Sequence, residues 1–512
     1  MNASGFDQWA LTIAVFLPIA GAVCVAATPR AEETAQKLLA LLFTLGTLGM
    51  GVYLLVQFDY DHTDKLQFVV DNRWIDVIHS RYHMGIDGIS LPLVLLSMGI
   101  VVLCVIYSWD HWPEPHDPKA FIILMLVLET GMVGTFCAED LILFFVFFEL
   151  VLLPMYFMIG RWGGPNRQYA SIKFFLYTLF GSALMILSFL ALYFKAGNTF
   201  DIPTLIQNGG AIATGTAVLI FGGLFMGFAI KVPMFPFHTW LPDAHTEAPT
   251  VGSVILAAVL LKLGTYGFIR IAIPILPQAA TKWAPWIGLL AVVGIIYGAL
   301  GCLAQRDMKR LIAFSSVAHM GFVMLGISTL TSYGIDAAVF GMVAHGLITG
   351  MLFFLAGSIQ ERFHTRELSR LGGLLIQAPR MGWILGFCAM ASLGLPGLAG
   401  FWGEFPAILS AYAPAAPLNA ALFRGYMVTA AVGTVLAAGY LLWMYQRTAF
   451  GEPSEEFAHV HIHDVHVPEW LAWTPLLALI VALGVYPHLL FRVTDGAVVH
   501  NVLSAFQGAT GQ

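Results

Sequence analysis

The sequence predicts an all-α polytopic membrane protein with about fourteen transmembrane helices. Of its 512 residues, 58% are apolar and only 11% are charged, whereas soluble proteins average about 25% charged residues. The apolar runs recur along nearly the whole chain with short polar stretches between them. This pattern describes a protein that crosses a lipid bilayer many times, and it excludes a series of soluble domains.

Each predicted helix corresponds to one apolar run, because a span needs about 20 such residues. The first run is interpreted as a helix and not as a cleaved signal, since no basic segment precedes Leu11. The fourteen predicted spans are roughly 10–28, 38–58, 88–109, 120–138, 141–160, 174–194, 212–236, 251–272, 286–304, 311–330, 337–359, 382–412, 425–446 and 470–488.

Two of these runs predict interrupted helices. The run 212–236 ends in Pro233 and Pro236, and the run 382–412 contains the sequence GLPG at 394–397. Proline removes a backbone donor and clashes with the preceding turn, so a helix breaks or kinks there.

The distribution of Lys and Arg predicts the orientation. If the spans alternate, one side carries 14 of these residues, in 29–37, 110–119, 161–173, 305–310, 360–381 and at 447. The other side carries eight, three of them in the long loop 59–86. By the positive-inside rule the first side is cytoplasmic (or matrix), and both termini face the opposite side.

Several classes of function are excluded by composition. The net charge of −6 is spread out, so no basic tract suggests nucleic acid. No nucleotide-binding motif or C-x-x-C pair is present, and the five cysteines are far apart, as expected of small buried side chains. The histidines of the loop 459–466 have spacings that would suit a metal, but a solvated loop is the favoured interpretation; they are His459, His461, His463 and His466.

Charged side chains inside the apolar runs are the main functional signal. They are Glu129, Glu149, Lys231, Lys262 and Glu404. A charge at the centre of a bilayer costs roughly 2.5–3.5 kcal/mol on insertion scales, so several of them imply a function that offsets the cost. A row of carboxylates, lysines and histidines at membrane depth suits proton transfer, because burial and neighbouring charges tune when each group holds a proton.

For each of these residues, a purely structural role is an alternative. Buried ion pairs can orient helices without any chemistry, and Glu129 can simply pair locally. The histidines at membrane depth, His319 and His345, and His238 beside the first break, can equally be hydrogen-bonded core residues. Lys231 and Glu404 weigh against the purely structural reading, because both lie beside helix breaks, where polar cavities form in transporters.

Four stretches resemble the antiporter-like subunits of respiratory complex I, over residues from about 80 to 450. They are FAIKVPMFPFHTWLPDAH at 228–245, ELVLLPMY at 149–156, RDMKRLIAFSSVAHMG at 306–321 and GLAGFWGEF at 397–405. Within this family the chain looks most like the subunit M type, the counterpart of mitochondrial subunit 4. The sister subunits L and N are known for a lysine where this chain has Glu404, and subunit L continues into a long lateral helix.

The resemblance implies two inverted five-helix repeats, each with one broken helix. The first would cover 120–272 and the second 286–446, between an N-terminal segment 1–119 and a final loop and span 447–512. Glu149 and Lys231 would form a coupled pair, Lys262 a central carrier and Glu404 a terminal carrier. His319 and His345 would continue the polar axis, with His238 and Glu129 as secondary members.

The function implied by the resemblance is proton translocation in the membrane arm of an NADH:quinone oxidoreductase, in a bacterial or mitochondrial inner membrane. This chain would bind no cofactor; NADH, FMN, iron–sulfur clusters and quinone would belong to partner subunits. Its partners would be other membrane-arm subunits, including L and N, and lipids. The alternatives are a subunit of a multi-chain sodium/proton antiporter, a subunit of a membrane-bound hydrogenase-type complex, and a structural scaffold.

Overall fold

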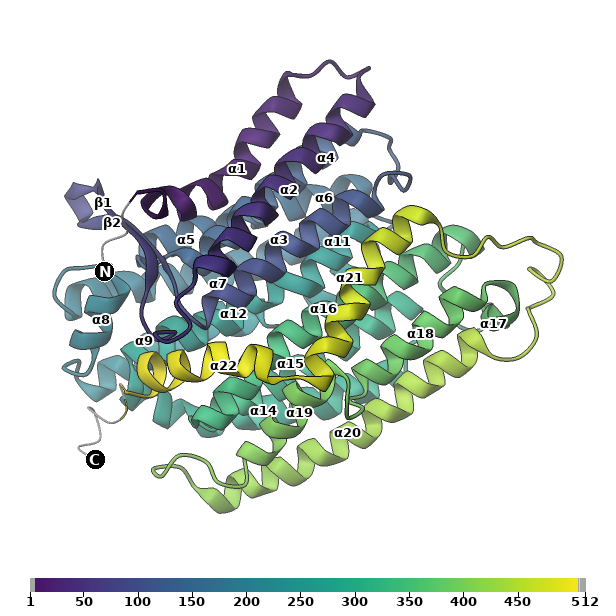
Figure 1. Ribbon diagram of the computed structural model, residues 1–512. Helices are drawn as coiled ribbons and strands as arrows, with labels where there is room; N and C mark the ends of the chain where they lie inside the picture. Colours follow the sequence, from purple (N-terminus) through teal and green to yellow (C-terminus); the bar gives the residue numbers. More distant parts are fainter. Residues whose placement is uncertain (1–4, 505, 507–512) are drawn as a thin grey trace.

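The computed structural model, which describes residues 5–504 and 506, is a bundle of long, roughly parallel helices (Figure 1). Thirteen of these helices are long and apolar enough to cross a membrane. The segments α18 (Pro379–Ser392) and α19 (Ala399–Ser410) are each shorter, and together they form one interrupted crossing. All fourteen apolar runs of the sequence therefore become helical, and the predicted fold class is confirmed.

The N-terminal segment contains three spans and one hairpin. The spans are α1 (Asp7–Ala27), α2 (Glu33–Gln57) and α3 (Ser90–Tyr107). The antiparallel strands β1 (Gln67–Ile75) and β2 (Ser80–Ile86) pair between α2 and α3. The sequence analysis did not predict this hairpin. It lies at the opposite end of the bundle from the loop between α20 and α21 (Figure 1).

Five crossings follow, and the fourth of them is broken. Their helices are α4 (Pro118–Cys137), α5 (Leu141–Leu150) with α6 (Leu152–Trp162), α7 (Arg167–Lys195), α9 (Thr214–Lys231) with the short α10 (Trp240–Glu247), and the run from α11 (Thr250–Ile255) to α13 (Ile273–Ile275). The short helix α8 (Ile202–Gly209) was not predicted.

The next five crossings have the same order of whole and broken helices. They are α14 (Pro277–Leu303), α15 (Met308–Ser328), α16 (Ser332–Phe363), the broken pair α18 and α19, and α20 (Ala420–Ala449), with the short α17 (Leu374–Gln377) between α16 and α18. The structure begins α14 at Pro277, nine residues before the predicted 286. Its first turns contain polar residues such as Gln278 and Lys282 and are therefore not part of the apolar run.

The last crossing is α21 (Val467–Val485), which is followed by α22 (His488–Ala497) and a π-helical segment (Val498–Leu503). The sequence analysis predicted only the crossing. Thr494 of α22 donates a hydrogen bond of 2.8 Å to Asp336 at the start of α16, so the C-terminal region is tied to that helix.

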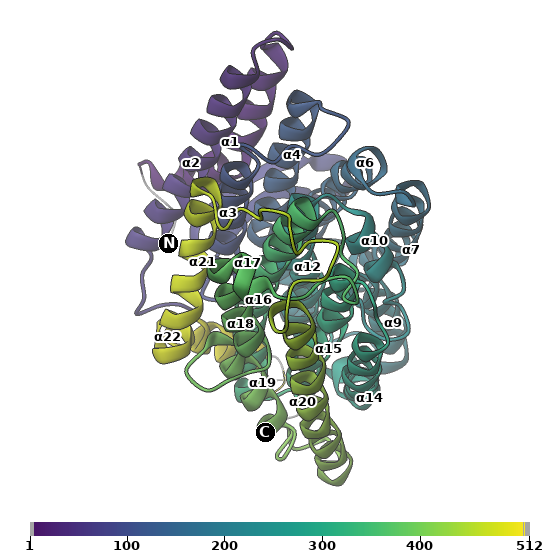
Figure 2. The same cartoon turned by 90° about the vertical axis from the view of Figure 1, so that its right-hand side faces the viewer.

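Two crossings occupy the middle of the bundle. The helix 250–275 and α16 are the only candidate spans of the described chain whose apolar windows are completely buried. Figure 2 shows α12 and α16 near the centre, with α1 and α2 at one edge and α14 and α20 at another. The outer helices expose large apolar side chains such as Trp286 and Leu219, as a surface in contact with lipid requires. Cys24 on α1 also belongs to this outer face, so the expectation that the cysteines are buried is wrong there.

Candidate functional site

Lys262 lies at the centre of the bundle, on a helix with two irregular turns. π-helical segments at Leu256–Leu260 and Phe268–Ala272 flank α12 (Leu261–Gly267), which carries the lysine. Such wide turns occur often at functional sites. The side chain of Lys262 is fully buried. Its Nζ donates to the carbonyl of Ala257 at 2.5 Å, within the first π segment, and lies 2.7 Å from Nδ1 of His345 on α16.

The polar row continues from His345 to Glu404. The ring centroids of His345 and His319 are 6.0 Å apart. Nδ1 of His319 lies 2.5 Å from Oε1 of Glu404. His345, His319 and Glu404 line one small cavity together with Thr349 and Ser392; its volume of about 20 Å³ is sufficient for one water molecule. The residues predicted as central carrier, connecting histidines and terminal carrier therefore lie in a continuous row.

The second helix break positions Glu404 in this row. α18 ends at Ser392, Gly394 and Gly397 have positive φ angles of 78° and 92°, and α19 begins at Ala399. Glycine adopts this left-handed conformation without strain. The side chain of Ser392 lies 3.1 Å from Nε2 of His319. The break thus brings a hydroxyl group and the Glu404 carboxylate to the same imidazole.

A close helix contact holds α19, the helix that carries Glu404, against α16. A methyl group added to Gly403 would lie only 2.5 Å from Cα of Gly341. Overpacking of this kind typically costs about 1–3 kcal/mol. We expect Gly403→Ala to separate α19 from α16 and to lower the midpoint temperature of unfolding. Gly425→Ala on α20 is the matched control, because its added methyl group meets no atom within 4 Å; equal behaviour of the two variants would contradict the prediction.

Lys231 and Glu149 lie at the first helix break. Lys231 is the last residue of α9 and is 3% exposed. Its Nζ lies 4.8 Å from the ring centroid of Phe148, a favourable cation–π distance. Glu149 on α5 is close enough for the two charges to interact. No direct ion pair joins them among the described residues, so they are neighbours and not hydrogen-bonded partners.

Two predicted members of the relay stand apart from it. Glu129 is fully buried in α4, and within the described chain neither carboxylate oxygen has a hydrogen-bond partner. His238 packs between aromatic rings, with its centroid 4.9 Å from that of Tyr297, and its Nδ1 has no partner among the described residues. The structure therefore does not connect either residue to the lysines by hydrogen bonds.

Two buried groups near Lys262 were missed by the sequence analysis. His245 on α10 is fully buried, its ring stacks on Phe353 with centroids 4.4 Å apart, and neither ring nitrogen has a partner in the described part of the chain. Its charge would interact with both Lys262 and Lys309. Lys309 was counted with the loop residues, but it is only 2% exposed and donates to the carbonyl of Ala248 at 2.6 Å.

A third missed group is an ion-pair network at the end of the bundle that carries the hairpin. Arg270, also counted as a loop residue, is 5% exposed; its Nη2 lies 2.6 Å from Asp87, and its Nε lies 3.6 Å from Glu139. Burial opposes ionisation of Asp87, but the guanidinium outweighs burial and lowers the pKa of Asp87. Burial raises the pKa of Glu139 to about 7. Asn501 of the C-terminal segment also donates to Asp87, at 2.8 Å.

The histidines of the loop 459–466 are all exposed. The rings of His461 and His463 are 4.9 Å apart between centroids. Within residues 5–504 and 506, no three His, Cys, Asp or Glu side chains lie together in an arrangement that could hold a metal ion.

Comparisons with known proteins identify the family of this chain. The family model described as NADH:quinone oxidoreductase/Mrp antiporter, TM, matches residues 138–434, and the one described as NADH-ubiquinone oxidoreductase chain 4, amino terminus, matches residues 65–135. NADH-quinone oxidoreductase subunit M of Rhodobacter capsulatus is 42% identical over 96% of both chains. NADH-ubiquinone oxidoreductase chain 4 of Arabidopsis thaliana is 38% identical over 92% of this chain and 93% of its own length.

Solved structures share the fold. A chain of respiratory complex I from Thermus thermophilus is 28% identical, with a TM-score of 0.85 over 96% of this chain and 99% of that one. A chain of the Mrp complex from Dietzia is 22% identical, with a TM-score of 0.82 over 97% of this chain and 52% of its own length; this second likeness concerns the fold alone. By its matched region and its full-length relatives, this chain belongs to the NADH:quinone oxidoreductase/Mrp antiporter transmembrane family.

Proposed function

We propose that this chain is a proton-translocating membrane-arm subunit of an NADH:quinone oxidoreductase. The observation that carries the proposal is the buried row of Lys262, His345, His319 and Glu404, which runs across the two central helices, α15 and the second break. Burying so many ionisable groups is costly, and structures that bury them in a membrane commonly use them for ion or proton movement.

The row can move a proton with the help of one water molecule. The ammonium of Lys262 donates to Nδ1 of His345, which requires the neutral ring to carry its own proton on Nε2. Transfer to Nδ1 allows release from Nε2, which has no partner in the described chain. A water in the small cavity can carry that proton to His319 or Glu404. The lysine then becomes neutral, and the carboxylate becomes a carboxylic acid.

Glu149 and Lys231 would drive this transfer from the first half of the chain. A change of charge elsewhere in the complex, caused by quinone reduction, would change the distance between these two groups. The free energy of holding a proton on Lys231 would then change, and with it the proton affinity of Lys262. The proposed repeats, 120–272 and 286–446, would each contribute one half of the route, between the segments 1–119 and 447–512.

The experiment measures proton pumping in membrane vesicles that contain the assembled complex. We expect Lys231→Ala and Glu149→Ala to lower NADH-driven pumping by about tenfold or more, since general acid–base groups contribute factors of 10²–10⁴. Glu149→Asp keeps the charge and should be milder. Glu455→Ala, at an exposed carboxylate of the loop before α21, is the control. Normal pumping by both alanine variants would rule out the mechanism.

The rival functions make different predictions. A subunit of a sodium/proton antiporter would exchange ions without NADH, and a hydrogenase-type complex would use another electron donor. The similarity to subunit M relatives, at 42% identity over 96% of both chains, favours the oxidoreductase over the Mrp complex, where identity is 22%. A scaffold predicts that variants of the buried charges assemble and pump normally.

In the proposed assembly, other subunits bind the redox cofactors and the substrates. NADH, FMN, iron–sulfur clusters and quinone would bind to other subunits, and no redox centre would lie in this one. The neighbours would be other membrane-arm subunits, including L and N. The location would be the bacterial inner membrane, or the mitochondrial inner membrane for an organelle-encoded chain, with the side richer in Lys and Arg facing the cytoplasm or matrix.

A further inference from the structure

A large cavity opens at the end of the bundle that is richer in Lys and Arg. Its volume is about 490 Å³, and its walls come from the loops 110–113 and 162–165, the segment 247–251 and the end of α16. Titratable side chains line it, among them His111, Glu247, Lys309 and Glu361. This volume holds many water molecules, so the side chains on its walls are in contact with the aqueous phase.

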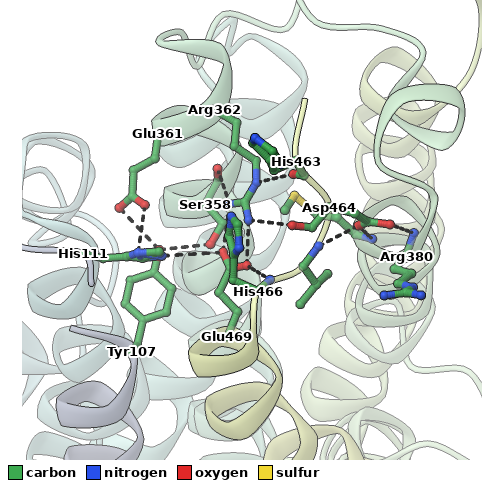
Figure 3. A network of polar contacts seen from close by, with 12 residues as sticks. Tyr107, His111, Ser358, Glu361, Arg362, Arg380, His463, Asp464, His466 and Glu469 are labelled. Carbon is green, nitrogen blue, oxygen red and sulfur yellow. Dashed lines mark hydrogen bonds and ion pairs between the residues drawn. The ribbon is translucent and has the colours of Figure 1, made fainter. Parts of the chain in front are cut away.

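Glu361 and His111 lie side by side at this cavity. Nδ1 of His111 is 3.5 Å from Oε2 of Glu361. The hydroxyl of Tyr107 lies 3.0 Å from that of Ser358 and donates to Glu361 at 3.4 Å. The side chain of Glu361 is 40% exposed, whereas that of His111 is 11% exposed. Nε2 of His111 has no hydrogen-bond partner among the described residues and lies 4.0 Å from Oε1 of Glu469. Figure 3 shows this pair beside the arginine network.

The nearby arginine does not neutralise Glu361, because it binds a different carboxylate. Arg362 donates to both oxygens of Glu469, at 2.8 and 2.7 Å, and also to the carbonyls of His463 and Asp464 (Figure 3). Glu469 is fully buried, and Arg362 is its ion-pair partner. Glu361 has only the weaker contacts with Tyr107 and His111, so its charge remains available for binding a proton.

His111 is suited to pass on a proton and not to hold one at neutral pH. Burial lowers its pKa, and the charge of Arg362 and the proximity of His466 act in the same direction, while Glu469 and Asp110 oppose them. Glu361 faces Glu469, Arg362, Tyr107 and Lys309 as well. A neutral imidazole next to a carboxylate can take up a proton at one nitrogen and release it from the other.

Electrostatic interactions continue from the wall of this cavity to Lys262. Lys309 lies on its wall and donates to the carbonyl of Ala248. His245, three residues before Ala248, is fully buried, and its charge would interact with both Lys309 and Lys262. This route comes from α10, α15 and α16, and it does not pass Lys231 or Glu149.

We infer that Glu361 and His111 form a proton-collecting site, which takes protons from water in this cavity and supplies them to Lys262 through Lys309 and His245. The inference rests on the proposed function. A hydronium ion in the cavity gives its proton to the Glu361 carboxylate or to His111. The proton passes inward to the neutral amine of Lys309, then to a ring nitrogen of His245 and to the neutral amine of Lys262, and each earlier carrier returns to its starting form.

The first test removes the collecting carboxylate. Glu361→Gln in the assembled complex is expected to lower proton pumping about tenfold, with pumping largely retained in Glu361→Asp. Glu456→Gln is the matched control, because this exposed carboxylate lies in the adjacent loop, pairs with Arg370 and is absent from the cavity wall. Wild-type pumping by Glu361→Gln, in a complex present at wild-type amounts, overturns the inference.

The second test blocks the cavity without changing a charged residue. Gln360 lies on its wall and is half-buried. A Gln360→Cys variant in inside-out vesicles is treated with a bulky, membrane-impermeant thiol reagent. We expect labelling to lower pumping at least about fivefold, while the same treatment leaves the parent chain, with its four buried cysteines and Cys24, unaffected. Absence of labelling, or complete labelling with unchanged pumping, overturns the inference.

The two proposals fail in different ways. If Lys231→Ala and Lys262→Ala abolish pumping but Glu361→Gln and labelled Gln360→Cys pump normally, the relay stands and this uptake site is wrong. If all of these variants pump normally, the proposed function fails.

Discussion

Lys262→Arg is expected to abolish proton pumping by the complex, although it keeps the positive charge. Guanidinium is never deprotonated in proteins, so arginine can hold a proton at this position but cannot pass it to His345. The lysine is fully buried between the Ala257 carbonyl and His345. We expect pumping to fall by about tenfold or more, measured as vesicle acidification per NADH oxidised.

Two further variants separate the loss of proton transfer from a loss of packing. Lys262→Gln is smaller than arginine and neutral, and it should be equally inactive. Lys195→Arg, at the exposed end of α7, should pump normally. A scaffold role for Lys262 requires the opposite pattern, in which Lys262→Arg retains pumping because it preserves the charge. Pumping at the wild-type rate in Lys262→Arg would exclude this residue as a carrier.

The second large effect concerns stability. Arg270→Ala removes the only cation that directly pairs with Asp87 and Glu139 among the described residues. Breaking a buried ion pair on one side costs roughly 3–5 kcal/mol, because the remaining charge loses its partner in a medium that solvates it poorly. We expect a much lower midpoint temperature of unfolding for the purified complex, and less of this chain in the membrane.

Arg81→Ala is the matched control for this prediction. Arg81 pairs with Asp71 at 2.6 Å across the hairpin at the same end of the bundle, but the two side chains are 41% and 39% exposed. Exposed pairs contribute only about 0–1 kcal/mol. Similar losses of stability in the two variants would show that burial of the Arg270 network has no special importance.

Much of the fold follows from the sequence because lipid permits few solutions. Apolar length predicted the crossings, and Pro233, Pro236 and the GLPG segment predicted both breaks. The β hairpin was missed, because its strands lie in a polar loop without the strict alternation that indicates a strand. The short helix α8 was missed for a similar reason: eight residues carry little periodic signal.

The candidate site was predictable where depth alone identifies a residue. Lys262, His319 and His345 lie in the middle of long apolar runs, so their burial and proximity were expected. Arg270 and Lys309 lie near the ends of spans, where long side chains usually reach water, and only tertiary contacts reveal that they do not. His245 lies in the polar stretch after the first break, which gives no sign that a buried helical turn forms there.

The relation between Glu149 and Lys231 shows a further limit of the sequence. A motif predicts that two groups are neighbours, but the distance between their charged atoms depends on rotamers and packing. Here the ammonium faces the Phe148 ring, and no direct ion pair with Glu149 forms. In the proposed mechanism, quinone reduction elsewhere in the complex changes the distance between Lys231 and Glu149.

α16 connects three polar sites that lie far apart along the axis of this helix. Its 32 residues span about 48 Å, with Asp336 near one end, His345 near the middle, and Glu361 and Arg362 near the other. A helix is stiff along its axis, so a piston-like displacement of α16 would carry all three sites by the same amount. The proposed sites of proton uptake and internal transfer and the C-terminal contact through Thr494 would therefore move together with this one helix.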